Sequence, residues 1–173
     1  MSGSRIAFAL LACLGLCAFS NGKYSIKFPP GFEAAESINE AESGVQSNGP
    51  ASAGKVWCRA NSVPLPAIGD LTQKQINEEF RAPLDHETWA GFMGVDAAKF
   101  SESQPRVRLV AGHLVQEATF DFADDVLGFP ARARWSAHIL PGRVVNGVCF
   151  AATLDYERNR PSFEAALASL RPL

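Results

Sequence analysis

The chain has 173 residues with 16 basic and 18 acidic side chains, and its formal net charge is −2. Its length suits one domain with a core large enough to fold without disulfides. The charge is small and no long run of either sign occurs, which argues against binding to nucleic acid or to an anionic membrane surface. We therefore expect a single domain whose main task involves neither.

The first twenty residues have the composition of a secretory signal peptide. A short start with one basic residue, Arg5, precedes the apolar residues 6–19, and Ala18 and Ser20 form the small-x-small pattern that a signal peptidase cleaves. The apolar segment is too short to span a bilayer, and no later segment is long enough. We predict a signal peptide over residues 1–20 and a single globular exported domain over residues 21–173, located in the periplasm or secreted.

A lipid anchor is the alternative for this leader. Leu10, Leu11 and Ala12 precede Cys13 in a loose match to a lipid-modification site, with a small residue directly before the cysteine. The apolar run before Cys13 is short, so the ordinary secretory pattern fits better. On the alternative, the protein is anchored to a membrane through Cys13.

The start of the mature chain alternates apolar and polar residues. Residues 24–28 predict a strand, which the sequence Pro29-Pro30-Gly31 ends in a turn. Residues 33–53 are rich in Glu, Ser, Gly, Asn and Ala, and we expect a surface loop there. Residues 55–60 predict a second strand, which the prolines at 64 and 66 end.

Capping residues indicate two short consecutive helices in the middle of the chain. Thr72 and Gln75 have the spacing of a capping box, and the helix that follows them ends before Pro83. Asp85 is suited to cap the second helix, and Gly94 to end it in the left-handed conformation. The sequence thus predicts a helical centre between strands.

Residues 131–153 predict a β-hairpin that turns at Pro141-Gly142. In that register Trp135 faces Val148 and Ala133 faces Phe150, so the apolar partners share one face. Residues 106–111 and 113–122 predict two further strands ahead of it. A final helix is expected from Pro161, because residues 163, 166, 167 and 170 are apolar at helical spacing.

The order of these elements defines the fold class. Strands stand at both ends of a helical centre, and their connections are short enough for hairpins. We expect an α+β domain in which helices flank an antiparallel sheet.

Cys58 and Cys149 are the two cysteines that remain after cleavage of the leader. Both lie in predicted strands, and an even cysteine count in an exported chain favours a disulfide bond. Two buried free thiols are the alternative. A redox-active pair is not expected because no Cys-x-x-Cys spacing remains.

The polar face of the hairpin is our candidate surface for a ligand or a partner. Arg132, Arg134 and His138 lie on it, and His113 and Glu117 lie opposite them if the preceding strand is its neighbour. A cationic patch of this kind suits an anionic small molecule or a partner protein. The alternative is ordinary charge pairing between strands, on a solvated or helix-covered face.

The three histidines suggest a second hypothesis about function, a metal site or a hydrolytic site. His86, His113 and His138, with carboxylates such as Glu87 and Glu117, could serve a small exported metal-binding protein or hydrolase. The sequence contains no His-Glu-x-x-His motif, no Gly-x-Ser-x-Gly elbow and no phosphate-binding glycine-rich loop. We therefore assign no catalytic residue, metal ligand or cofactor, and favour a non-enzymatic binding or accessory protein that is monomeric or weakly oligomeric.

The two ends of the chain carry a family resemblance. Residues 24–32, Tyr-Ser-Ile-Lys-Phe-Pro-Pro-Gly-Phe, resemble the opening strand and turn of PsbP-like proteins, the extrinsic photosystem subunits and their bacterial relatives. Residues 162–170 resemble the final helix of the same fold. The resemblance implies an α/β/α sandwich around an antiparallel sheet and a non-enzymatic accessory or binding role. No functional motif matches, so it implies no site residue.

Overall fold

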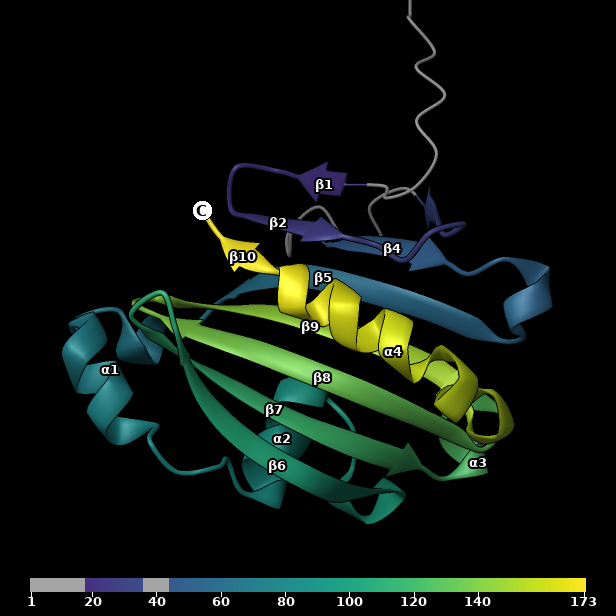
Figure 1. Ribbon diagram of the computed structural model, residues 1–173. Helices are drawn as coiled ribbons and strands as arrows, with labels where there is room; N and C mark the ends of the chain where they lie inside the picture. Colours follow the sequence, from purple (N-terminus) through teal and green to yellow (C-terminus); the bar gives the residue numbers. More distant parts are fainter. Residues whose placement is uncertain (1–17, 36–43) are drawn as a thin grey trace, which may run out of the picture.

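The computed structural model describes residues 18–35 and 44–173, which form two antiparallel sheets and the helices that cover them (Figure 1). A three-stranded sheet has the order β1–β2–β10, with β1 (Ala18–Ser20), β2 (Tyr24–Lys27) and β10 (Arg171–Pro172). A seven-stranded sheet has the order β3–β4–β5–β9–β8–β7–β6. Its strands are β3 (Glu33–Ala35), β4 (Val45–Asn48), β5 (Val56–Pro64), β6 (Phe100–Val110), β7 (His113–Phe122), β8 (Ala131–Leu140) and β9 (Arg143–Ala152).

The helices lie on both faces of the large sheet. The α-helices are α1 (Gln73–Glu79), α2 (His86–Met93), α3 (Asp124–Leu127) and α4 (Thr153–Ser169). Short 3-10 helices are η2 (Ala51–Ala53), η3 (Pro66–Ile68) and η4 (Ala97–Lys99). Figure 1 shows α4 across β8 and β9 on one face, with the small sheet beside it, and α2 behind the sheet. The expected fold class, an antiparallel sheet flanked by helices, is confirmed.

The β8–β9 hairpin has the expected register. Trp135 pairs with Val148 and Ala133 with Phe150 across the strands, and Gly142 takes a left-handed φ of 70° in the turn. Gly147 lies inside β9, as the pairing of the apolar residues requires. A Cβ atom at Gly147 would lie 2.9 Å from Cδ2 of Leu167, so the absence of a side chain lets α4 approach β9 closely.

The two central helices begin at the expected residues, and α1 ends at Glu79, ahead of Pro83. Thr72 Oγ1 accepts a hydrogen bond from the Gln75 backbone N–H, and the Gln75 side chain accepts one from the Thr72 N–H, which completes the capping box. Asp85 caps α2 by accepting a hydrogen bond of 2.7 Å from the Thr88 N–H, which lowers the pKa of the Asp85 carboxyl. Gly94 follows with a left-handed φ of 65°.

Three expectations about local structure are wrong. Residues 33–53 are not a loop throughout: they contain β3, β4 and η2, while the part of that range between 36 and 43 lies outside the described residues. Val45 and Ser47 of β4 are buried, so a segment of polar composition still supplies strand residues to the core. β6 begins at Phe100, six residues before the expected start.

The third correction concerns the final helix. α4 begins at Thr153, eight residues before Pro161, and the proline lies in its interior. A proline there lacks the N–H for one helical hydrogen bond, which normally disfavours such a position. Burial offsets part of this cost, because Tyr156 ahead of the proline and Phe163 behind it both contact the sheet's core and are 2% and 0% exposed.

Two apolar cores lie on opposite faces of the large sheet. The first joins β2, β5, β9 and α4 and includes Tyr24, Phe28 and Phe163. The second joins β7, β8, β9 and α2, where Trp89 contacts Phe120 and Trp135 at ring-centroid distances of 5.2 and 6.2 Å. No helix among residues 18–35 and 44–173 is long and apolar enough to cross a membrane.

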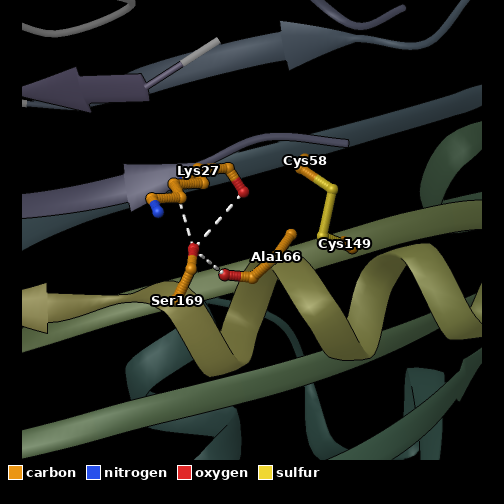
Figure 2. The surroundings of a disulfide bond; sticks show 5 residues. All are labelled: Lys27, Cys58, Cys149, Ala166 and Ser169. Carbon is orange, nitrogen blue, oxygen red and sulfur yellow. Dashed lines mark hydrogen bonds between the residues drawn. A yellow bond between two sulfur atoms is a disulfide. The ribbon is translucent and has the colours of Figure 1, made fainter. Parts of the chain in front are cut away.

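Cys58 and Cys149 form the expected disulfide bond. They are directly opposite each other in the β5–β9 pair, and both are fully buried. Figure 2 shows the bond beside α4, whose Ser169 is tied to β2: the Ser169 hydroxyl accepts a hydrogen bond of 2.8 Å from the Lys27 N–H and donates one of 2.6 Å to the Ala166 carbonyl. The bond therefore joins the two strands at the centre of the first core.

Candidate functional site

A cavity of about 540 Å³ lies between the large sheet and the helices α2 and α3. Its floor is formed by alternate residues of β5, namely Trp57, Arg59, Asn61 and Val63, together with residues of β8 and β9. The helical side is apolar and is formed by Phe92, Met93, Val95, Val126 and Leu127. The volume lies within the range of roughly 300–1,000 Å³ that is typical of small-molecule sites.

Aromatic rings form much of the floor of the cavity. Trp57 and Phe150, neighbours on β5 and β9, stack at a centroid distance of 4.2 Å with an interplanar angle of 22°. The ring centroids of Phe122 and Phe150 are 5.5 Å apart, and Trp135 also lines the cavity. The β5–β9–β8 register places these side chains on the same face of the sheet. The cavity can therefore receive an apolar body that contacts flat ring surfaces.

The polar residues of this cavity are few and lie close together. Asn61 of β5 is directly opposite Asn146 of β9, and Arg59 lies two residues from Asn61 on the same strand face. The Oδ1 atom of Asn146 accepts a hydrogen bond of 3.3 Å from Trp135 Nε1–H. An apolar space with a small number of convergent polar groups is the usual composition of a ligand site.

The hairpin's polar face, the candidate surface of the sequence, is on the opposite side of the sheet under α4. Arg134 Nη2 lies 3.1 Å from Glu117 Oε2, and their side chains are 9% and 10% exposed. Arg134 Nη1 donates to Thr119 Oγ1 at 3.1 Å, and Arg108 binds the other oxygen of Glu117. The charges of Arg134 and Glu117 are therefore paired inside the protein, while Arg108 pairs with Glu117 from a half-exposed position.

Arg132 lies at the end of the same row of residues. It binds Asp121 through two hydrogen bonds of 2.6 and 3.2 Å, and hydrogen bonding to Asp121 raises the pKa of the guanidinium. The Oε1 atom of Glu157 in α4 lies 3.5 Å from Arg132 Nη1. A polar recess of about 150 Å³ remains beside Arg132, Arg134 and Tyr156, and two glutamates of α4 line it as well. The guanidinium charges at this recess are therefore balanced by carboxylates.

His113 and His138 form a buried pair on this face. His113 Nε2 and His138 Nδ1 are 2.9 Å apart, and the two residues are 8% and 2% exposed. Burial is the main cause that lowers the pKa of His138 to about 3, and repulsion from His113 when it is protonated and from Arg171 and Arg108 lowers it further. Burial is also the main cause of the lowered pKa of His113. Both rings are therefore neutral at pH 7, and one donates its N–H to the other.

The structure places the candidate residues on one face of the sheet, and α4 covers that face. Arg134, His138, His113 and Glu117 are buried, and Arg132 alone keeps a partly exposed side chain. The reason is that α4 begins earlier than expected and covers the strands. The helix-covered face with charge pairing, which was the alternative interpretation, describes this arrangement.

The three histidines do not converge. His86 of α2 contacts the Ala97 carbonyl through Nε2 at 2.9 Å and lies against Phe100. This position is on the α2 side of the sheet, whereas His113 and His138 lie on the α4 side. Among residues 18–35 and 44–173, no group of three or more His, Cys, Asp or Glu side chains is placed to hold a metal ion.

Sequence reasoning did not find the cavity. Its residues come from β5, α2, α3, β7, β8 and β9, and they are apolar side chains of the kind that usually fill a core. In the sequence alone, Trp57 and Trp135 are indistinguishable from core residues for that reason. The alternation of Trp57, Arg59, Asn61 and Val63 on one strand face was a usable signal, because a charged residue and an amide interrupt an otherwise apolar row.

No family model matches the chain, and no curated protein matches it. Solved structures are similar in fold. The solution structure of cyanobacterial PsbP (CyanoP) from Synechocystis sp. PCC 6803 aligns with a TM-score of 0.63 and 11% identity over 96% of this chain and 98% of that one. A crystal structure from Bacteroides thetaiotaomicron VPI-5482 aligns with a TM-score of 0.52 and 11% identity over 93% of this chain and 49% of that one. The chain therefore has a PsbP-like fold, as the resemblance of its two ends predicts.

Proposed function

We propose that the protein is an exported binding or accessory module that works without catalysis and holds a small, mostly apolar molecule in the cavity between the sheet and α2–α3. The observation that carries the proposal is the cavity itself, with stacked aromatic rings on its floor and a few polar groups among them. A PsbP-like fold is compatible with an accessory role.

The export part of the proposal rests on the leader and on the disulfide bond. We place the mature start at Asn21, after the small-x-small pattern. A buried disulfide is stable in an oxidising compartment and rare in a reducing one. Cleavage after Ser20 would also remove β1, so β2 of the mature protein would pair only with β10. The mass of the protein recovered from the exported fraction tests this start, and a lipid-modified Cys13 would refute it.

The neutral apolar dye N-phenyl-1-naphthylamine is a suitable probe for the cavity. It carries no charge, so its binding reports on apolar space alone. We expect saturable binding with enhanced dye fluorescence and quenching of the tryptophans that line the cavity. Val126→Trp, which narrows the cavity, and Trp57→Ala, which removes one of the stacked rings, should each weaken binding.

The control is a change of apolar surface elsewhere. Leu154 of α4 is 98% exposed and does not line the cavity, so Leu154→Ala removes an apolar side chain without altering the cavity and should leave dye binding unchanged. Thermal unfolding of each variant shows whether it is folded at the assay temperature. Absence of saturable binding by the folded wild-type protein would refute the proposal, as would equal loss in the Leu154→Ala control.

A further inference from the structure

The aromatic rings that line the cavity form one connected group across the sheet. Trp57 of β5 and Phe150 of β9 are nearly parallel at a centroid distance of 4.2 Å, and the ring of Phe122 on β7 lies 5.5 Å from that of Phe150 at an angle of 32°. On β8, which separates β9 from β7, the residues at this level are Ala131 and Ala133. Because alanine is small, the rings on either side of β8 come into contact, and the aromatic surface continues from β5 to β7.

A surface of this kind favours an aromatic ligand over a saturated one with the same skeleton. Ring pairs in offset-stacked or edge-to-face contact gain free energy beyond that of the area they bury. A rigid ring system also loses few internal rotations on binding. The opposite wall includes Met93, whose flexible side chain can adapt to the far side of such a ring system.

Asn146 contributes a hydrogen-bond donor to the same cavity. The residue is 5% exposed, and its Oδ1 atom accepts a hydrogen bond of 3.3 Å from Trp135 Nε1–H, a group that can only donate. This contact directs the oxygen of the carboxamide toward the indole. The NH₂ group meets no acceptor among the described residues and is not enclosed by protein atoms, so it is open to the cavity that Asn146 lines. A ligand with an acceptor at this point would satisfy a donor that is otherwise left unpaired.

The acceptor that suits this position is neutral. Arg59 and Asn61 already have interaction partners within the protein, so Asn146 is the residue that we assign to the ligand. Its amide N–H carries no charge, and most of the surrounding walls are apolar. Moving a charged group from water into such a space would cost more than one neutral hydrogen bond returns. A carbonyl oxygen meets the requirement.

We propose that the ligand is a neutral aromatic carbonyl compound, with a ring system in contact with Trp57 and Phe150 and a carbonyl oxygen that accepts from Asn146 Nδ2. Asn146 and Phe150 are four residues apart on β9, so their Cα atoms are separated by about 13 Å. Two fused rings with a carbonyl substituent, together with the two side chains, can bridge this distance. The inference rests on the proposed function, because it names the class of ligand for the same cavity.

The first test measures the hydrogen bond with two ligands that differ in one group. 2-Acetylnaphthalene carries a ketone oxygen, and 2-isopropylnaphthalene has a methyl group in the place of that oxygen. Each competes with N-phenyl-1-naphthylamine for the wild-type protein and for Asn146→Leu, which has a side chain of similar volume without the donor. Asn146→Leu should weaken the ketone about fivefold more than the hydrocarbon, the loss expected for one neutral hydrogen bond. The comparison between two ligands cancels a general effect of the substitution on the cavity.

The second test measures the ring contact. 2-Acetyldecalin has the same ketone on two saturated rings, so it keeps the acceptor and loses the aromatic surface. Trp57→Leu keeps an apolar side chain in the floor of the cavity and removes a ring from the stacked pair. This variant should weaken 2-acetylnaphthalene about fivefold more than 2-acetyldecalin, the difference expected for the loss of one aromatic pair.

A matched asparagine serves as control. Asn48 of β4 is exposed and does not line the cavity, so Asn48→Leu should leave the affinity for every ligand unchanged. Equal weakening of ketone and hydrocarbon by Asn146→Leu would overturn the inference, as would equal weakening of the two ketones by Trp57→Leu; in both cases dye binding would still support the cavity as a ligand site. Failure of the dye itself to bind would refute the proposed function instead.

Discussion

The buried pair of His113 and His138 makes the stability of the protein depend on pH in a range where few other groups titrate. In the unfolded chain a histidine has a pKa of about 6.5. In the folded protein burial and nearby positive charges lower the pKa of His138 to about 3. Between these two values the unfolded chain binds a proton that the folded protein does not, so acid favours unfolding.

The size of the effect follows from the pKa of His138. Above pH 6.5 the neutral His138 ring is bound by no extra proton in either state, so its contribution to the free energy of unfolding is present in full. As the pH falls from 6.5 toward 3, the unfolded chain takes up a proton that the folded protein does not, and this contribution is lost progressively. From pH 7 to pH 5 the loss is about 2 kcal/mol for this one side chain, at about 1.4 kcal/mol per pH unit once the unfolded histidine is protonated. The pKa of His113 is lowered as well, so its contribution has the same sign.

Urea unfolding at pH 7, 6 and 5 measures this loss, because most carboxylates are still ionised in that range. His138→Gln should reduce the decrease in unfolding free energy between pH 7 and pH 5 by roughly 2 kcal/mol. His86→Gln changes a histidine on the other face of the sheet and should keep the wild-type pH dependence. A wild-type protein whose stability is constant from pH 7 to pH 5, or a His138→Gln variant with the wild-type pH dependence, would refute the reasoning.

Three further predictions concern stability. Replacing Cys58 and Cys149 together by alanine should lower the free energy of unfolding by about 4.6 kcal/mol, the loop-closure value for residues 91 apart, with an unchanged circular dichroism spectrum. An unaltered urea midpoint would contradict this prediction. Gly147→Val should lower the free energy of unfolding by about 1–3 kcal/mol, because the valine side chain would meet Leu167 of α4. An unchanged free energy of unfolding would mean that α4 shifts to make room. Arg134→Met should lower the free energy of unfolding in urea by at least about 2 kcal/mol, because it deprives the buried Glu117 carboxylate of one partner. Arg132 is partly exposed, so Arg132→Met should cost less than about 1 kcal/mol. Equal losses in the two variants would contradict the argument from burial.

Local signals in the sequence predicted much of the fold. The Thr72 capping box, the left-handed Gly94 and the turn at Gly142 depend on residues within a few positions of one another, so their geometry follows from short-range sterics and hydrogen bonding. The hairpin register followed from the pairing of Trp135 with Val148, since a shift by one residue would exchange the two faces.

Long-range packing decided the elements that the sequence did not predict. β4 is a strand because Val45 and Ser47 are buried in its pairing with β5, although the segment lacks the composition of a strand. α4 tolerates Pro161 because Tyr156 and Phe163 bury their rings on either side of it. The cavity depends on six elements meeting in space, and no periodicity in one segment can indicate a volume that remains unfilled.

The two faces of the hairpin contribute differently to the structure and to the proposed function. The charged face looked functional because Arg134, His138 and Glu117 are unusual residues, but under α4 they bind one another and have become part of the core. On the other face of the sheet, the stacked rings of Trp57 and Phe150 line the cavity. In a sheet covered on both sides, every polar side chain must find a partner inside the protein, so polarity alone no longer indicates a surface. A more informative signal is a place where packing is incomplete, because protein interiors are close-packed and voids larger than a water molecule are few.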